Sequence, residues 1–552
     1  MKRTLQFRIA NPRVTDLQKW LERRRFAVPQ LQREFVWNGS KAAKLFDSIY
    51  RRLTIGTLLV WETSSDNSDW LRQELHLLPP FNKANDEVWY LIDGQQRLTV
   101  MYQAALGEVK QNSNGREVDF RRITFALDPY DKDEEAFSYR HEVEGRYVAV
   151  ADILSRHWRH LCNGCSRTKR EKLGRCRRIL LDYRVPILYI NTKSIEDVRE
   201  TFLRINSGGT RVTAADEAFA RASRFNLRAH VHTLRSALPG LENVDPNAIL
   251  QGFSFVCGKR EVHKRVTQMT VKEWENKIRE NEASRDQFDR AWNDYSDAVH
   301  KAANFLRLEF CVYSLDFLPS ENMLAVLSFF YYSNGAQPSS AQRREIRKWF
   351  WATAAGNRYS GRGHRINIVA DIRFFERLAK HKYCHFPPVE RTPVSEIVRT
   401  QYSVKTSLGR AFFCLLASRK PRRLLADGEI PVDVVAGRAD KQNKHHVFPK
   451  NLLARHGFAA REYNSLANIC FLPAEENESI GKQPPHDYLG QLRRKYGFPG
   501  KMRSHLIPRK TGSGIWMHDI KKAFRQFRRE RSAEVRRAFK EAAGIDLFRE
   551  DR

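Results

Sequence analysis

Long apolar runs are missing from this sequence of 552 residues. No stretch approaches roughly 18 uninterrupted apolar residues, the length that a membrane-spanning helix needs, so we expect no segment that crosses a membrane. The first residues, 1–8, are rich in basic side chains but lack the apolar segment that follows them in a signal peptide. We therefore expect a cytoplasmic protein.

Cysteine is also scarce, with eight residues in the chain, and disulfides are not expected in a cytoplasmic protein. Most cysteines lie alone among apolar neighbours and are interpreted as small core residues. One group has ligand types at zinc-like spacing: His157, His160, Cys162, Cys165 and Cys176. Because no second Cys-x-x-Cys pair follows, the sequence leaves open whether this group binds zinc.

Acidic residues are the rarer charged type: 64 Asp and Glu stand against 96 Lys and Arg, a formal net charge of +32. Such an excess attracts polyanions, most simply DNA or RNA. A basic protein with solvated charged faces has the same composition. Charge alone cannot separate these alternatives, or DNA from RNA.

The length exceeds what one hydrophobic core supports, and the pattern divides the chain into three parts. Residues 1–234 alternate apolar runs with helical spacing, residues 235–385 are mainly helical in pattern, and residues 386–552 form a third unit. Three prolines within 384–393 mark the best linker. The expected class is therefore an α+β multidomain protein that ends in a basic amphipathic helix over 520–543.

Local patterns place several elements in the first part. Short apolar runs predict strands at 57–61, 88–92, 123–127 and 185–190. A helix is expected over 98–106, and two capping boxes, at 194–197 and 213–216, predict further helix starts.

The segment 444–450, Lys-His-His-Val-Phe-Pro-Lys, is the most informative of the third part. Adjacent residues of a strand point to opposite faces, so one histidine could bind a metal while the other faces a substrate. Two asparagines, Asn468 and Asn477, and a lysine, Lys482, follow downstream. Histidines in a surface turn and asparagines in turns are the structural alternative.

This set resembles the HNH nucleases with the ββα-metal fold, in their His-x-Phe-Pro variety. The resemblance implies that His446 is the general base, that Asn468 orients it, and that Lys482 is the basic residue after the motif. It also implies that His445 and Asn477 are metal ligands, with asparagine in place of the family's last histidine.

The chemistry of phosphodiester hydrolysis suits these residue types. A neutral imidazole can take a proton from water near pH 7. Neutral nitrogen and oxygen ligands leave most of a cation's charge free to act on a phosphate, which favours Mg²⁺ or Mn²⁺, with Zn²⁺ or Ni²⁺ as alternatives.

A second motif, 93–97 (Asp-Gly-Gln-Gln-Arg), lies between a predicted strand and a predicted helix. Gly94 permits a tight turn, the helix start offers free N–H groups to an anion, and Arg97 could bind a phosphate. A polar strand-to-helix turn is the alternative. No P-loop competes for a nucleotide, because Gly252–Arg260 has the wrong spacing and lacks Ser or Thr after its lysine.

The motif and its surroundings resemble the ParB-like amino-terminal domain of GmrSD-type, modification-dependent restriction systems, which often carry an HNH domain at the other end. The resemblance implies a nucleotide site, for GTP, CTP or ATP, that also includes an early Gln-Arg pair and a later Asn-Ser-Gly-Gly turn. The implied residues are Gln32, Arg33, Asp93, Gly94, Gln95, Gln96, Arg97 and Asn206.

We therefore expect a metal-dependent endonuclease of a restriction or anti-phage defence system. It would recognise modified phage or foreign DNA and respond to nucleotide binding or hydrolysis, either as one chain or as a homo-oligomer. A DNA-binding sensor with a degenerate nuclease domain and an RNA-cleaving effector are the two alternatives.

Overall fold

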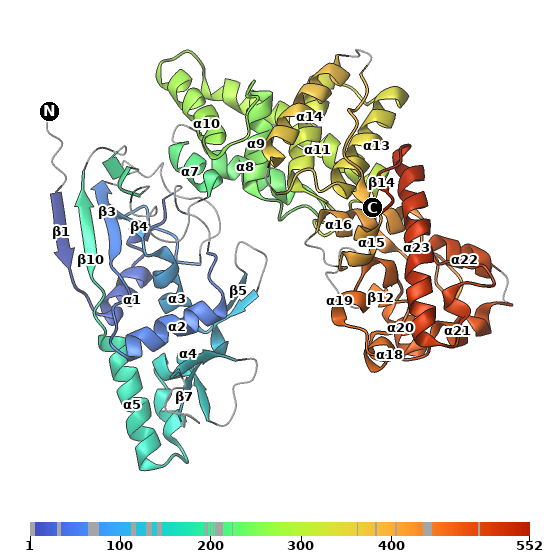
Figure 1. Ribbon diagram of the computed structural model, residues 1–552. Helices are drawn as coiled ribbons and strands as arrows, with labels where there is room; N and C mark the ends of the chain where they lie inside the picture. Colours follow the sequence, from blue (N-terminus) through green and yellow to red (C-terminus); the bar gives the residue numbers. More distant parts are fainter. Residues whose placement is uncertain are drawn as a thin grey trace. The chain divides into compact units, whose positions relative to one another are not determined.

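The computed structural model describes residues 6–29, 32, 35–64, 77–111, 117–127, 135–140, 146–192, 194, 197–198, 200–202, 204, 213–222, 225–361, 363–380, 384–402, 406–433, 444–494 and 497–551. The chain forms two compact units, residues 1–229 and 230–552 (Figure 1). The predicted subdivision of the second unit near residue 385 remains a prediction. Within the described ranges, no helix is both long and apolar enough to cross a membrane.

The first unit is built on a five-stranded mixed sheet with the strand order β1-β10-β3-β4-β2. Its strands are β1 (Gln6–Ala10), β2 (Phe26–Ala27), β3 (Leu58–Ser64), β4 (Glu87–Asp93) and β10 (Ile187–Asn191). β10 runs parallel to β3, and β3 pairs antiparallel with β4. The predicted strands at 57–61, 88–92 and 185–190 are thus central strands of this sheet.

Apolar side chains cover both faces of the sheet, which explains why β4 has an uninterrupted apolar run. Trp89 and Leu91 belong to a core that includes helices α1 (Val14–Glu22), α2 (Gly39–Tyr50), α3 (Gln95–Leu106) and α5 (Arg167–Asp182). Val88, Tyr90 and Ile92 point into a smaller cluster on the other face.

A small antiparallel sheet, in the order β8-β7-β9, completes this core. Its strands are β7 (Ile123–Ala126), β8 (Phe137–Tyr139) and β9 (Tyr147–Ala149). The short helix α4 (Val150–Leu154) and a second ribbon, β5 (Val109–Gln111) with β6 (Glu117–Asp119), lie in the same unit. Helix α7 (Ala214–Arg221) begins with the capping box predicted at Thr213 and Asp216.

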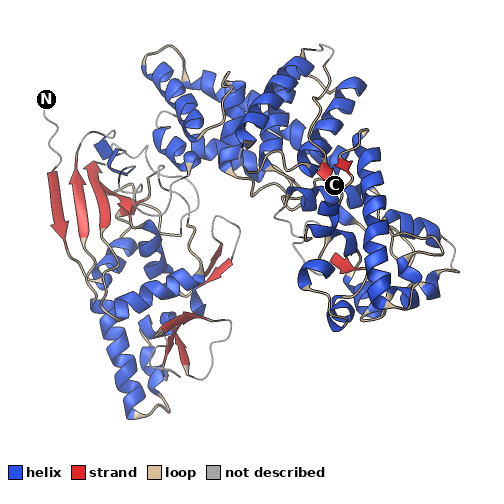
Figure 2. Cartoon of the chain, in the orientation of Figure 1, coloured by secondary structure: helices blue, strands red, loops and turns tan. Residues whose placement is uncertain are grey.

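The second unit is largely helical (Figure 2). Its first helices are α8 (Leu227–Ser236), α9 (Pro246–Val256), α10 (Lys264–Arg279), α11 (Arg285–Phe310), α12 (Glu321–Asn334), α13 (Ser340–Ala355) and α14 (His364–Ala379). After the proline-rich segment come β11 (Thr392–Pro393), α15 (Ser395–Arg399) and α16 (Ser407–Ser418).

The last part carries a two-stranded hairpin of β12 (Lys444–His446) and β13 (Ile469–Phe471). Short helices follow each strand: α18 (Lys450–Arg455), α19 (Ala460–Tyr463), α20 (Ala474–Ile480), α21 (Pro485–Tyr488) and α22 (Phe498–Ser504). The long helix α23 (Ile520–Ala543) has the bounds that the sequence predicts, and β14 (Phe548–Arg549) pairs with β11. Aromatic contacts join parts of this unit on either side of the proline-rich segment, such as Trp351 with Phe539.

The structure does not show a zinc site at the group of His157, His160, Cys162, Cys165 and Cys176. Although all five residues are described, no three His, Cys, Asp or Glu side chains of the described chain gather as a metal site. Cys165 instead donates to the carbonyl of Leu161, and Cys176 is buried in the core of α5. Of the five, only Cys176 is a core residue, and His157 and His160 are exposed.

Candidate functional site

The candidate nuclease centre is formed by the β12–β13 hairpin and the helix that follows it, α20. His445 lies opposite Cys470, and His446 lies opposite Ile469, in an antiparallel ladder. The order of elements is strand, strand, helix, and Asn477 lies on that helix. The two histidines therefore point to opposite faces, as the strand pattern predicts.

His445 faces α20. Its Nδ1 atom makes a hydrogen-bonding contact with Oδ1 of Asn477, and only 3% of the residue is exposed. Its Nε2 atom is buried without a hydrogen-bond partner in the described structure. Burial lowers the pKa of His445 to about 4, so its imidazole is neutral at physiological pH.

His446 lies on the other face, between the rings of Tyr402 and Tyr463. Its Nε2 atom is 2.9 Å from Oδ1 of Asn464. An amide oxygen only accepts, so Nε2 carries the proton and Nδ1 is left as the basic nitrogen. Burial also lowers the pKa of His446, which keeps the ring in its neutral, proton-accepting form near pH 7.

Asn468 is fully buried beneath the turn that follows the histidines. Its Oδ1 accepts from the Phe448 N–H at 2.8 Å, and its Nδ2 donates to the carbonyls of Phe448 at 3.0 Å and Tyr463 at 2.9 Å. These bonds fix the backbone of Phe448, two residues after His446, and of Tyr463, whose ring contacts His446. They do not touch the ring of His446, so the side chain that directly orients the imidazole is Asn464.

Three further residues lie near the hairpin in sequence or in space. Lys482 lies beyond the end of α20, after Gly481, and is exposed. Tyr488 donates its hydroxyl to the carbonyl of Val447 at 2.9 Å, and buried Arg531 donates to the carbonyl of Ile469 at 2.7 Å. Sequence reasoning missed Asn464, Tyr488 and Arg531. Only for Asn464 was there a signal, its place in the same segment as Asn468.

The donor set of this face fits a divalent cation. Because Oδ1 of Asn477 only accepts, Nδ1 of His445 carries the proton, and the free lone pair is on Nε2, which is buried without a partner among the described residues. A neutral imidazole nitrogen of this kind suits a divalent cation. Since the described residues hold no cluster of three His, Cys, Asp or Glu side chains, a cation here would depend on Asn477 as well as His445.

The amino-terminal motif forms the turn between β4 and α3. Gly94 adopts a φ of +94°, and a Cβ atom there would lie 2.2 Å from the Leu58 side chain, so the turn requires glycine. Arg97 reaches back over the turn, and its guanidinium donates to the carboxylate of Asp93 at 2.8 Å. The same group donates to the carbonyls of Ile55 at 2.7 Å and Thr57 at 3.0 Å.

The glutamines of this constellation also hold backbone groups. Gln32 donates to the carbonyls of Leu91 and Ile92, and Oε1 of Gln96 accepts from the Val36 N–H at 2.9 Å. The Oε1 atom of Gln95 is buried without a partner among the described residues.

The structure thus brings Gln32 and the 93–97 turn together, as the resemblance implies. The remaining residues of the predicted nucleotide site, Arg33 and Asn206, lie outside the described residues.

Comparison with known proteins finds a family likeness in the first unit. Residues 17–222 match the family model of the GmrSD restriction endonuclease, N-terminal domain. An uncharacterized protein of Methanocaldococcus jannaschii is 21% identical over 525 residues, which cover 86% of each chain. That likeness therefore extends beyond the first unit. The family match supports a relation to GmrSD-type restriction endonucleases through the amino-terminal domain.

Proposed function

We propose that this protein is a metal-dependent DNA endonuclease of a restriction or anti-phage defence system, and that it cuts DNA at the β12–β13 hairpin. One observation carries the proposal. A single hairpin presents His445 with Asn477 on one face and His446 with Asn464 on the other. The hairpin thus supplies a candidate metal ligand and a candidate proton acceptor, the two functions that metal-assisted hydrolysis of a phosphodiester needs.

His446 is the general base of the proposed reaction. Its Nδ1 atom takes a proton from a water molecule as the water oxygen attacks the phosphorus atom. A P–O bond to the sugar breaks, and the leaving oxygen takes a proton from solvent. Asn464 keeps the imidazole in the required tautomer through Nε2, and Asn468 holds the backbone around it. Lys482 is exposed close in sequence to α20 and would act on the charged substrate.

The proposed cation, Mg²⁺ or Mn²⁺ with Zn²⁺ or Ni²⁺ as alternatives, would be held by His445 and Asn477, and would polarise the phosphate and neutralise its charge. The depressed pKa of His445 supports this role, because a ligand must be neutral and a cation need not compete with a proton.

The first unit would regulate cleavage. The match of residues 17–222 to the GmrSD amino-terminal family supports a role in sensing modified foreign DNA and in binding a nucleoside triphosphate. Gln32 and the 93–97 turn, which lie together, would form part of the nucleotide site. GTP, CTP and ATP are the candidates.

The test of the nuclease compares His446→Ala with His456→Ala in the full chain. His456 lies in the same part of the unit, at the end of α18, and its ring only bonds the carbonyl of Leu452 at 2.8 Å. Nicking of supercoiled plasmid is followed with Mg²⁺, with Mn²⁺ and with EDTA. His446→Ala should slow nicking by about 10²- to 10⁴-fold, the usual contribution of a general base, and leave plasmid binding unchanged.

Several results would contradict the proposal. Retained cutting by His446→Ala removes that residue from the mechanism, and cutting in EDTA removes the cation. A wild-type chain that shifts the plasmid's mobility but never nicks it is a sensor. Preferential cleavage of labelled RNA over DNA identifies an RNA-cleaving effector instead.

A second experiment tests regulation. Phage DNA with and without base modification is offered with each nucleoside triphosphate, to the wild type and to Asp93→Ala. The variant breaks the ion pair with Arg97 and should lose nucleotide hydrolysis or dependence on modification, while plasmid nicking in Mn²⁺ continues. Equal rates for both proteins on all substrates would reject the nucleotide site.

A further inference from the structure

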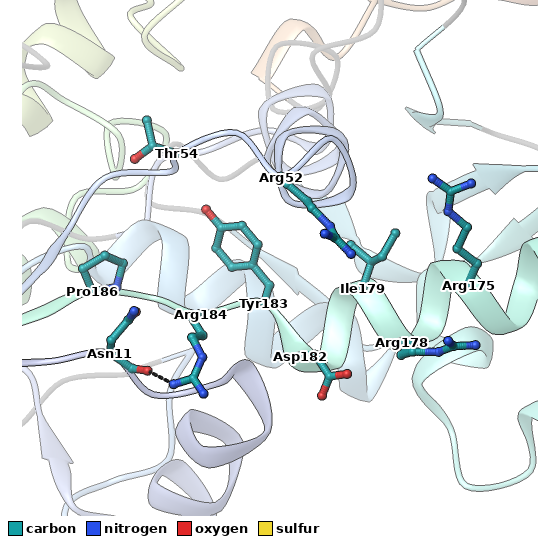
Figure 3. Close-up of a pocket in the computed structure, with 10 residues that line it drawn as sticks. All are labelled: Asn11, Arg52, Thr54, Arg175, Arg178, Ile179, Asp182, Tyr183, Arg184 and Pro186. Atoms are coloured by element: carbon teal, nitrogen blue, oxygen red, sulfur yellow. Dashed lines mark hydrogen bonds between the residues drawn. The ribbon is translucent and has the colours of Figure 1, made fainter.

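A basic pocket in the first unit belongs to neither constellation described above. It has a volume of about 770 Å³ and is formed by the end of α5, the segment that follows α5, and the loop after α2 (Figure 3). The lining residues are Asn11, Arg52, Thr54, Arg175, Arg178, Ile179, Asp182, Tyr183, Arg184 and Pro186.

The lining of this pocket carries more positive than negative charge. Four arginines line it against one carboxylate, Asp182. That carboxylate is already paired with Arg13, which lies 3.6 Å away and is not part of the lining. The guanidinium groups are therefore not neutralised by acidic residues of the pocket, and their summed potential favours an anion.

Most of these guanidinium groups are free to bind an anion. Arg52, Arg175 and Arg178 are exposed, and their guanidinium groups make no hydrogen bond or ion pair to a residue that the structure describes. Arg184 alone is engaged, by donating to the carbonyl of Asn11 at 2.9 Å, a bond that Figure 3 shows. Arg52 has a φ of +58° at the end of α2, a conformation that is strained for residues with a side chain.

We propose that this pocket binds the phosphodiester backbone of duplex DNA. The lining offers little that would hold a free nucleotide's base: Tyr183 is the only aromatic residue in it, and its hydroxyl is already used to donate to Leu53 at 2.7 Å. Basic residues also continue along α5 beyond the pocket: Arg170 is exposed, and exposed Arg167 is paired with Glu171 at 2.9 Å. A charged track longer than one nucleotide fits a polymer of phosphates.

The site lies next to the segment that the 93–97 motif fixes. Thr54 lines the pocket, and the following residues Ile55 and Thr57 accept hydrogen bonds from Arg97. The pocket wall is thus positioned by the motif itself. The inference rests on DNA as the ligand of the proposed function, but it does not depend on cleavage.

The experiment measures binding of an unmodified 30-base-pair duplex to the full chain by fluorescence anisotropy in EDTA, over a series of salt concentrations. The variant is Arg52→Gln, Arg175→Gln and Arg178→Gln combined. The matched control is Arg23→Gln, Arg156→Gln and Arg159→Gln combined, which removes the same charge from exposed arginines of the same unit outside the pocket. Thermal unfolding of both confirms that they fold.

Each phosphate contact contributes about 0.9 to the slope of log affinity against log salt, so the pocket variant should lose about 2 to 3 from the slope. Between 50 and 200 mM salt, the wild type should lose about 40-fold more affinity than this variant. The control should keep the slope of the wild type.

An equal loss in the two variants, or no loss in either, overturns the proposal. Loss of fluorescent GTP, CTP or ATP binding with an unchanged DNA slope also overturns it and makes the pocket a nucleotide site. Because cleavage is not measured, a chain that never nicks DNA can still show the pocket-dependent slope. A chain that nicks DNA with an unchanged slope refutes only this inference.

Discussion

Replacing Asn468 by alanine should release the turn that follows His446. The wild-type side chain makes three hydrogen bonds, two to the backbone of Phe448 and one to the carbonyl of Tyr463, and it is fully buried. A buried hydrogen bond contributes about 1 kcal/mol net, so the variant should lose about 3 kcal/mol. At 1.36 kcal/mol for each factor of ten, this corresponds to an effect of about 150-fold on local opening.

Hydrogen exchange detected by mass spectrometry measures this opening. In the wild type the Phe448 N–H is bonded to Asn468, so a peptide covering 444–450 should exchange faster in the variant by about that factor. Peptides from α11 should be unchanged if the effect is local. Cleavage should fall by about 10²-fold, because a shift of about 1 Å at a catalytic group has an effect of that size.

Asn451→Ala is the matched control, since Asn451 is exposed on α18 in the same segment. Exchange of 444–450 within threefold of the wild type in Asn468→Ala, together with unchanged cleavage, would refute the reasoning. Faster exchange without any loss of cleavage would separate the turn's stability from the position of His446.

Three further predictions concern single side chains. Asn464→Ala should slow plasmid nicking by about fivefold to tenfold without changing plasmid binding, because one hydrogen bond to the general base is lost; an unchanged rate would show that the imidazole needs no such partner. Asp371→Asn should destabilise the second unit by about 3 kcal/mol in urea unfolding, since it removes the buried carboxylate that pairs with half-buried Arg358 at 2.7 Å; an unchanged midpoint would contradict this. Gly94→Ala should lower the urea midpoint of the first unit far more than Gly164→Ala, because both have positive φ but only Gly94 meets a neighbour; equal shifts would mean that backbone strain alone decides.

Local patterns predicted the elements of the fold well where the physical signal is local. The apolar run of β4 and the amphipathic pattern of α23 each bury side chains in a way that periodicity reveals, and the capping box at Thr213 is a short-range bond. The opposite orientation of His445 and His446 also follows from strand geometry alone.

Contacts over long sequence separations were beyond such reasoning. Arg531 lies on α23, 62 residues from the strand carbonyl to which it donates, and no spacing rule joins the two. Asn468 was expected to orient His446. In the structure its amide instead bonds both the N–H and the carbonyl of Phe448. The sequence left zinc binding around Cys162 open for the same reason: these ligand types are close in sequence, but no three of them gather in space among the described residues.

Arg97 contacts both sites proposed in the first unit, the nucleotide site at the 93–97 motif and the loop that lines the DNA-backbone pocket. Its guanidinium holds the carbonyls of Ile55 and Thr57 as well as Asp93, and a Cβ at Gly56 would lie 2.5 Å from one of its nitrogens. A nucleotide phosphate bound at the motif would compete with these acceptors for the same charge. The loop that lines the arginine pocket would then lose the contacts that fix it, so that nucleotide binding would change the site proposed for the DNA backbone. A coupling free energy between the two ligands would follow if a bound phosphate draws the guanidinium away from these carbonyls.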